Sequence, residues 1–152
     1  MPHRVLSLVA LVGAAAVAVF PSAAAGAEAA DSVRARYTKY EYRVPMRDGV
    51  KLFTSVYVPK DAGAGRRYPI LLNRTPYSVA PYGSDAFPDK VGPSEAAAKE
   101  GFIFVSQDVR GRFMSEGQFV DVRPHNPAKG PKDVDESSDT WDTIDWLLKK
   151  LP

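Results

Sequence analysis

A tyrosine placed directly after a proline is the first residue of this sequence whose type and position could do chemistry. In the segment LLNRTPYS (71–78), two leucines are followed by polar and charged residues and then by Pro76-Tyr77. Proline fixes its own φ at about −65° and disfavours helix at Thr75, so the backbone largely sets the direction of Tyr77. The phenol O–H is either an ordinary loop group or a donor held where negative charge develops.

Serine catalysis within these residues has little support. His125, in Arg-Pro-His-Asn-Pro, could be a general base, but a solvated loop residue is the simpler interpretation. No G-x-S-x-G occurs, and Ser78, Ser106 and Ser115 have no base placed beside them. We therefore expect no Ser-His-Asp triad within the 152 residues. Cysteine is absent, which removes thiolate catalysis and most zinc arrangements.

Acidic residues crowd the C-terminal part of the chain and could suggest a cation site. They are Asp133, Asp135, Glu136, Asp139, Asp142 and Asp145. Helical spacing puts Asp135, Asp139 and Asp142 on roughly one side of a helix. A solvated helix face that complements the helix dipole is the simpler explanation for them. We predict no metal and no cofactor.

Asp108 and Arg110 follow an apolar run and are harder to dismiss. An arginine at the end of a strand can bridge to the acidic start of a helix. We therefore expect a structural ion pair here rather than a catalytic pair.

The composition is that of an ordinary globular protein, with 45% hydrophobic and 25% charged residues and a formal net charge of +2. Such a near-neutral chain gives no electrostatic reason to expect nucleic acid or acidic lipid as a partner. The sequence does not predict an oligomeric state.

The N-terminus is typical of an exported protein. Residues 1–27 combine Arg4, an apolar run from Val5 to Phe20 and a small-residue tail ending in an A-x-A pattern, which together predict a secretory signal peptide. An uncleaved membrane anchor is the alternative. Residues 28–36 are polar and unpatterned and are expected to form a mobile leader, and residues 37–152 the folded part. We expect a periplasmic or secreted protein with no stable membrane insertion after cleavage.

Two strands joined by a hairpin should begin the fold. Tyr40–Met46 and Val50–Val58 are extended runs separated by Arg47-Asp48-Gly49, and Asp-Gly is a strong hairpin signal. The alternation in the second run predicts one buried and one half-wet face, as near a sheet edge.

An α/β pattern follows the hairpin. Two apolar runs, Tyr68–Asn73 and Phe102–Asp108, predict strands that are covered on both faces. Between them, Thr75–Val91 predicts a functional loop, and Pro93–Glu100 predicts a short helix capped by Gly101. Residues 109–119, rich in turn-forming types, should form a structured loop.

The last element should be an amphipathic helix. Asp133 and Glu136 have capping-box spacing. An apolar stripe at helical intervals comprises Val134, Trp141, Ile144, Leu148 and Leu151. A hairpin followed by strand, loop, helix, strand, loop and helix is the opening of an α/β sheet. We expect a sheet that is truncated here, with a further parallel strand to come.

Four segments in this order and spacing resemble one family. They are YRVPMRDGVK (42–51), NRTPY (73–77), SQDVRGRFMSEGQF (106–119) and DESSDTWDTIDWL (135–147). Together they resemble the serine hydrolases that include cocaine esterase, X-Pro dipeptidyl-peptidase and the α-amino acid ester hydrolases. The resemblance covers about Tyr37 to Pro152.

The resemblance implies an α/β-hydrolase fold and acyl transfer from small-molecule esters or amides through a Ser-His-Asp triad. It implies that the tyrosine of the R-x-P-Y segment, here Tyr77, supplies a hydroxyl to the oxyanion hole. The nucleophile elbow and the rest of the triad would follow residue 152, so the chain alone should be inactive. The alternative is a short, secreted, non-catalytic binding module that retains half of the hydrolase fold.

Overall fold

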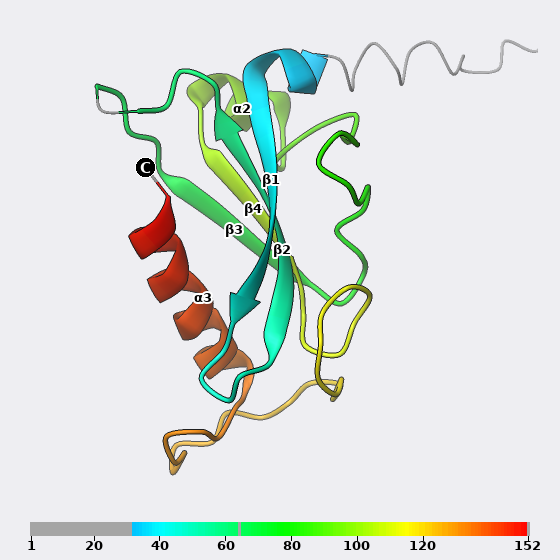
Figure 1. Cartoon of the computed structure of the whole chain (residues 1–152), viewed down its shortest axis with the longest axis vertical. Coiled ribbons are helices and arrows are strands. Elements are labelled where there is room, and N and C mark those ends of the chain that lie inside the picture. Colours follow the sequence, from blue (N-terminus) through cyan, green and yellow to red (C-terminus); the bar gives the residue numbers. More distant parts are fainter. Residues whose placement is uncertain (1–31, 64, 152) are drawn as a thin grey trace, which may run out of the picture.

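The structure is a computed structural model that describes residues 32–63 and 65–151, so the predicted signal peptide lies outside the described residues. Its strands and helices, in chain order, are β1 (Tyr37–Pro45), β2 (Lys51–Pro59), β3 (Ile70–Thr75), α2 (Glu95–Glu100), β4 (Ile103–Asp108) and α3 (Glu136–Lys150). Figure 1 shows these elements around one twisted sheet.

The sheet has the strand order β1-β2-β4-β3. β1 and β4 both pair with β2 in antiparallel fashion, whereas β3 and β4 are parallel. A hairpin that leads into a parallel pair through the connecting helix α2 confirms the predicted α/β opening. The carboxyl ends of β3 and β4 therefore lie side by side, with Thr75 opposite Asp108.

The hairpin forms as predicted, because Gly49 adopts a φ of 91° that other residues disfavour. The predicted position of its second strand was wrong. β2 lies inside the sheet, and every residue of it after Lys51 is buried. The alternation in sequence is genuine, but both faces of β2 are covered, because Tyr57 packs with Val91 on one face and Val56 packs with Leu147 on the other.

The two apolar runs that were predicted to form strands covered on both faces differ in their burial. β4 is buried at five of its six residues, as predicted. β3 lies at the edge of the sheet and alternates between partly covered and exposed side chains, so the prediction that both faces are covered is wrong for this strand. Within the described part of the chain β3 pairs with β4 only, and Ile70 and Leu72 pack against the cluster that contains Leu147 of α3.

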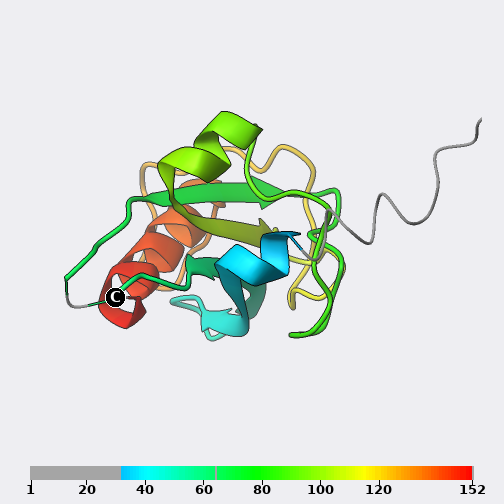
Figure 2. The same cartoon turned by 90° about the horizontal axis from the view of Figure 1, so that it is seen from above.

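Successive residues of the strands point into two separate hydrophobic clusters, one on each face of the sheet. On one face Tyr57 and Phe104 pack with Val91 of the long loop and with the alanines of α2. On the other face Val56 and Val105 pack with Leu147 of α3. Figure 2 shows α2 and α3 on different sides of the sheet.

The segment before β1 packs more closely than expected. Residues 32–36 are helical, and Val33 is buried in the cluster with Tyr37 and Phe104. The part of the expected leader that the structure describes is thus tied to the sheet. No helix among the described residues has the length and hydropathy needed to cross a membrane.

α3 presents a different face to the sheet from the one predicted. Its buried residues are Ser138, Asp139, Thr143 and Leu147, of which the last three are spaced by one helical turn. Of the predicted apolar stripe, Trp141 is 67% exposed and Leu148 71% exposed. The predicted capping box was also misplaced by two residues: Asp135 is the N-cap, and it exchanges hydrogen bonds with Ser138.

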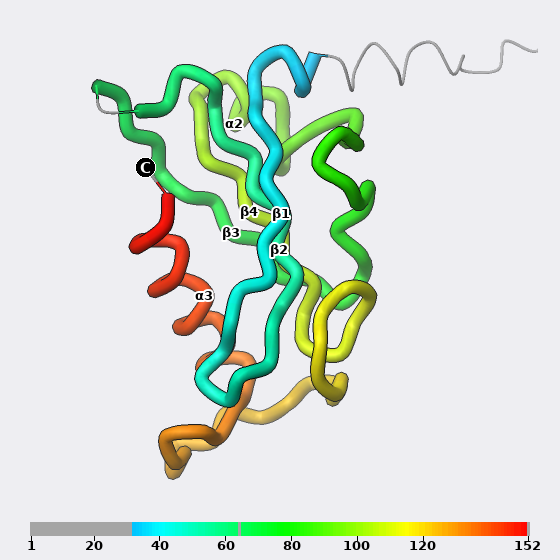
Figure 3. Tube along the Cα trace, viewed as in Figure 1, coloured from blue at the N-terminus to red at the C-terminus, as the bar shows by residue number. Residues whose placement is uncertain are grey.

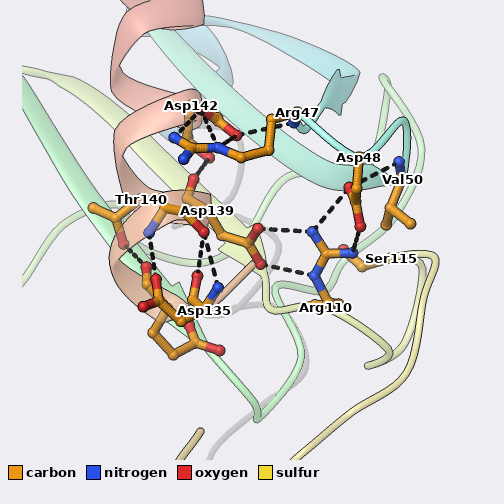
Figure 4. A network of polar contacts seen from close by, with 12 residues as sticks. Arg47, Asp48, Val50, Arg110, Ser115, Asp135, Asp139, Thr140 and Asp142 are labelled. Carbon is orange, nitrogen blue, oxygen red and sulfur yellow. Dashed lines mark hydrogen bonds and ion pairs between the residues drawn. The ribbon is translucent and has the colours of Figure 1, made fainter. Parts of the chain in front are cut away.

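Arg110 explains why a polar face of α3 is buried. Its guanidinium group donates two hydrogen bonds to Asp139, from Nε at 2.9 Å and from a terminal nitrogen at 2.7 Å. The same guanidinium group reaches Asp48 in the hairpin turn at 2.7 Å. Figure 4 shows Arg110 between these two carboxylates. This arrangement confirms the prediction of an arginine that bridges a strand end to the acidic start of a helix.

We name the ion pairs among Arg110, Asp48 and Asp139 the arginine clamp. Arg110 and Asp139 are both at least 95% buried. Burial opposes the charge of Arg110, but its hydrogen bonds to both carboxylates outweigh this cost and raise its pKa. A buried charge without its partner is strongly unfavourable, so the clamp holds only when all three segments are in place.

Further polar contacts extend the arginine clamp on both sides. Arg47 of the hairpin turn binds Asp142 of α3 at 2.8 Å. Within the sheet, the side-chain amide of Gln107 donates to Thr54 on β2 and to Thr143 on α3. Burying these polar groups is tolerable because each finds a partner.

Replacing Arg110 by methionine should destabilise the protein by about 3–5 kcal/mol, because it removes the cation that is hydrogen-bonded to the buried Asp139 carboxylate and leaves Arg74 3.9 Å away. Chemical denaturation would measure this change in the free energy of unfolding. Arg66→Met is the matched control, since the Arg66–Asp61 pair has side chains that are more than half exposed. That change should cost less than about 1 kcal/mol, and equal costs for the two variants would contradict the importance of the clamp.

Acid should weaken the arginine clamp. Burial works against ionisation of Asp48, but hydrogen bonds from Arg110 and the Val50 amide lower its pKa overall. The pKa of Asp142 is likewise lowered by its bonds from Arg47, against the effect of burial. A carboxyl whose pKa is lower in the folded protein stabilises the fold above its unfolded pKa of about 3.9 and loses this contribution as pH falls.

The free energy of unfolding should therefore decrease as the pH is lowered from about 5 towards 3. Denaturation curves recorded across this range would measure the decrease. Asp142→Asn removes one of the carboxyl groups whose pKa is lowered in the folded protein and should flatten the curve. An unchanged slope in this variant would show that the Asp142 carboxylate does not contribute.

Candidate active site

Tyr77 lies just beyond the carboxyl end of β3, as the sequence predicted. Its backbone N–H donates to the Thr75 hydroxyl at 3.0 Å, which closes a tight turn around Pro76. The Tyr77 side chain is 82% exposed. Among the described residues no group forms a hydrogen bond with its hydroxyl, so the phenol O–H is available as a donor.

The backbone around Tyr77 is held firmly although its ring is exposed. The carbonyl of Pro76 accepts a hydrogen bond from Arg112 Nε at 3.1 Å. On the other side of Tyr77, Ser78 has a φ of 52°, a conformation uncommon outside glycine. The Ser78 hydroxyl accepts a hydrogen bond from the Ala80 N–H at 3.1 Å. Tyr77 is thus a free side chain on a well-supported turn.

Asp108 ends β4 next to this turn and is fully buried. Its Oδ1 accepts the Val79 N–H at 3.0 Å. Its Oδ2 accepts the Tyr82 hydroxyl at 3.0 Å and the Met114 N–H at 3.3 Å. The expected ion pair thus forms at Arg110, while Asp108 binds only neutral donors among the described residues.

Tyr82 completes this arrangement. Burial and the adjacent Asp108 carboxylate raise the pKa of Tyr82 above its ordinary value, although the contact with Ser78 acts in the opposite direction. The phenol therefore stays protonated and donates to Asp108. Because that O–H is already used, Ser78 is the donor in the 3.0 Å contact between the Ser78 and Tyr82 hydroxyls.

The loop after β4, residues 109–119, is the structured loop that the sequence predicted. Figure 3 traces it beside the loop that carries Tyr77. Ser115 anchors it, donating to the Asp108 carbonyl at 2.6 Å and accepting the Phe53 N–H at 2.8 Å. Gly111 is needed in this loop, because a Cβ atom there would lie 2.1 Å from the Phe119 nitrogen.

His125 does not form a catalytic triad, although a serine and an aspartate lie beside it. Its Nδ1 is 3.2 Å from the Ser137 hydroxyl and 3.3 Å from an Asp135 oxygen. In a triad the nucleophile and the carboxylate occupy opposite ring nitrogens, whereas here both meet the same one. The side chain of His125 is 62% exposed, in agreement with the predicted solvated loop residue.

The acidic residues at the start of α3 are occupied by protein donors. Asp135 is buried, and the hydrogen bond from Lys129 is the main cause that lowers its pKa, with amide donors assisting. Asp139 and Asp142 bind arginines as described above. The predicted solvated face was therefore wrong for Asp135 and Asp139, because they face cations and amides of the protein.

Sequence reasoning missed Asp108 as the junction of two loops. It placed the residue at the end of a buried strand, which is correct, but paired it with a cation. The available signal was the parallel arrangement of the two apolar runs, since the carboxyl ends of neighbouring parallel strands meet at one edge of a sheet. That position brings Asp108 beside the residues that follow Thr75.

Comparison with known proteins agrees with this geometry. A family model described as X-Pro dipeptidyl-peptidase (S15 family) matches residues 48–152. Cocaine esterase from Rhodococcus sp. (strain MB1 Bresler) is 36% identical over 112 residues, which is 70% of this chain and 16% of the esterase.

Two solved structures are similar in fold as well as sequence. An α-amino acid ester hydrolase, labelled with selenomethionine, matches with a TM-score of 0.63 and 36% identity over 89% of this chain and 21% of its own. An aminopeptidase from the marine sediment archaeon Thaumarchaeota archaeon matches with a TM-score of 0.61 and 37% identity over 77% and 20% of the two chains.

The chain thus spans about a fifth or less of the length of these relatives. The matched residues contain the hairpin turn, the turn of Tyr77, the loop after β4 and the start of α3. With its mixed sheet, this is the opening of an α/β-hydrolase fold, and the chain belongs to the X-Pro dipeptidyl-peptidase (S15) family.

Proposed function

We propose that this chain is the N-terminal portion of an exported serine hydrolase that cleaves esters or amides, and that Tyr77 is part of its oxyanion hole. The observation that carries the proposal is the Tyr77 hydroxyl, which is exposed and unpaired among the described residues while its backbone is fixed. The names of the relatives, an esterase, an ester hydrolase and two peptidases, support acyl transfer.

The position of Tyr77 fits this role. Ligands of open α/β sheets bind outside the carboxyl ends of the strands, and Tyr77 stands at the carboxyl end of β3. In α/β-hydrolases the loop after the third strand contributes a donor to the oxyanion hole. A phenol O–H that has no partner in the free protein can donate to the oxygen of a tetrahedral intermediate as its negative charge develops.

The other catalytic groups are assigned to residues beyond this chain. The serine nucleophile, its histidine and its aspartate have no counterpart among the described residues, where His125 and Ser137 lack the required geometry. We infer that the 152-residue chain alone does not turn over substrate. The alternative of a non-catalytic binding module finds no support in the relatives, whose names are those of enzymes.

Tyr77→Phe in the full-length enzyme should lower kcat by about 10²–10³, because it deletes one oxyanion donor. KM should change by less than about threefold, since the hydroxyl acts on the transition state rather than on bound substrate. Hydrolysis of a p-nitrophenyl ester would measure both constants. Tyr40→Phe, an exposed tyrosine on β1, is the matched control and should keep full activity.

The same preparations would test the class of enzyme. A fluorophosphonate probe should label one serine, in the parent enzyme and in Tyr77→Phe, because the probe depends on a reactive nucleophile. Absence of labelling together with absence of turnover would reject a serine hydrolase. Labelling with an unchanged kcat in Tyr77→Phe would remove only Tyr77 from the mechanism.

We further propose that residues 1–27 direct export and are removed. The support is the sequence pattern alone, because these residues lie outside the described part of the chain. Mass spectrometry of the protein recovered from the native host should find a mature N-terminus close to Glu28. A protein that retains Met1 to Ala27 would favour the membrane-anchor alternative.

A further inference from the structure

Two loops meet beside Tyr77, and each contains one non-glycine residue in a left-handed backbone conformation. Ser78, in the loop after β3, has a φ of 52°, and Phe113, in the loop after β4, has a φ of 47°. Such conformations are unfavourable for residues with a Cβ and persist only where the surroundings enforce them. Their occurrence in neighbouring loops indicates a shared restraint.

Asp108 supplies that restraint. The two backbone N–H groups that its carboxylate accepts belong to Val79 and Met114, the residues directly after Ser78 and Phe113. Oδ1 therefore fixes the turn at Ser78 and Oδ2 the turn at Phe113, each through the amide that directly follows the left-handed residue. Tyr82 adds a third hydrogen bond from the first loop. An ionised carboxylate accepts at both oxygens, which no other side chain of this size can do.

Tyr77 lies between two contacts, one from the last residue of β4 and one from the loop that follows β4. Its preceding carbonyl, that of Pro76, is bound by Arg112, and the amide two residues after it, that of Val79, is bound by Asp108. The ring itself has no polar contact among the described residues. The direction of the phenol therefore depends on how these two backbone groups are held.

We propose that Asp108 is a positioning residue of the hydrolase: it holds the Tyr77 turn so that the hydroxyl stands ready at the oxyanion position. The inference rests on the proposed function of Tyr77 and adds a requirement to it. Asp108 does not touch the reacting atoms and acts only through Tyr77. A merely structural role would weaken the fold without a specific dependence on the Tyr77 hydroxyl.

A double-mutant cycle on the full-length enzyme separates these roles. Asp108→Asn preserves size but leaves one acceptor oxygen and turns an NH2 group towards a backbone N–H. With a p-nitrophenyl ester, kcat should fall by about 10- to 100-fold, part of the loss expected for the donor itself, while KM stays within about threefold. In the Tyr77→Phe background the same change should alter kcat by less than about threefold, because the group that Asp108 positions is already gone.

The outcomes distinguish the two proposals. If Asp108→Asn lowers kcat equally with and without the Tyr77 hydroxyl, Asp108 does not act through Tyr77, and the positioning role is rejected while the hydrolase proposal stands. If Tyr77→Phe itself has full activity, the oxyanion role fails and the positioning role fails with it. Fluorophosphonate labelling of each variant reports separately whether the nucleophile is intact.

Tyr82→Phe provides a second test if Asp108→Asn does not fold. It removes one of the three donors to Asp108 and keeps the ring against Phe53, whose centroid is 5.2 Å away. We expect a smaller fall in kcat, about three- to tenfold, that again disappears in the Tyr77→Phe background. An unchanged kcat in Tyr82→Phe, or a loss that persists without the Tyr77 hydroxyl, would overturn the proposal.

Discussion

The Arg110 guanidinium group, enclosed by the carboxylates of Asp48 and Asp139, is the interaction on which the rest of this structure depends. It joins the hairpin turn, the loop after β4 and the start of α3, segments that are far apart in sequence. A guanidinium group suits this position because its planar fork serves two carboxylates at once and keeps its charge at any physiological pH. Arg110 and Asp139 are buried, and burial of either charge is favourable only together with its partner.

The clamp also reaches the candidate active site. Arg110 lies in the loop after β4, and Arg112 of the same loop holds the carbonyl of Pro76. Asp108, two residues before Arg110, holds the amide of Val79. The last residue of β4 and two arginines of the following loop therefore connect the helix, the hairpin and the Tyr77 turn. The exposed phenol belongs to a rigid assembly although its own ring makes no polar contact among the described residues.

Local chemistry in the sequence predicted much of the fold. The Asp-Gly turn, the strands and the cap at Gly101 follow from residues that are neighbours in the chain. The face that α3 buries does not, because its aspartates and threonines are matched by Arg110, Gln107 and other partners on the sheet. The pattern of apolar residues alone therefore predicted that Trp141 and Leu148 face the sheet, whereas both are exposed.

The positions of the strands within the sheet could not be predicted from the sequence for a similar reason. Alternation showed that β2 has two kinds of face, but only the packing of Tyr57 with the long loop and of Val56 with α3 shows that both are covered. At the candidate site, Tyr77 was identifiable as a candidate from the turn and the family resemblance. Asp108 was not, because its role depends on two amides that become neighbours only when β3 and β4 align.

The arginine clamp has a consequence for recombining relatives of this protein. The four segments that carry the family resemblance are the ones that supply its charges and the contacts around it. Where the other parent lacks one of Asp48, Arg110 and Asp139, a chimera that exchanges the hairpin turn without the loop after β4, or that loop without the helix start, inherits an incomplete ion pair and leaves a charge without its partner. Crossover points should therefore be chosen so that all the clamp residues come from one parent, however distant they are in sequence.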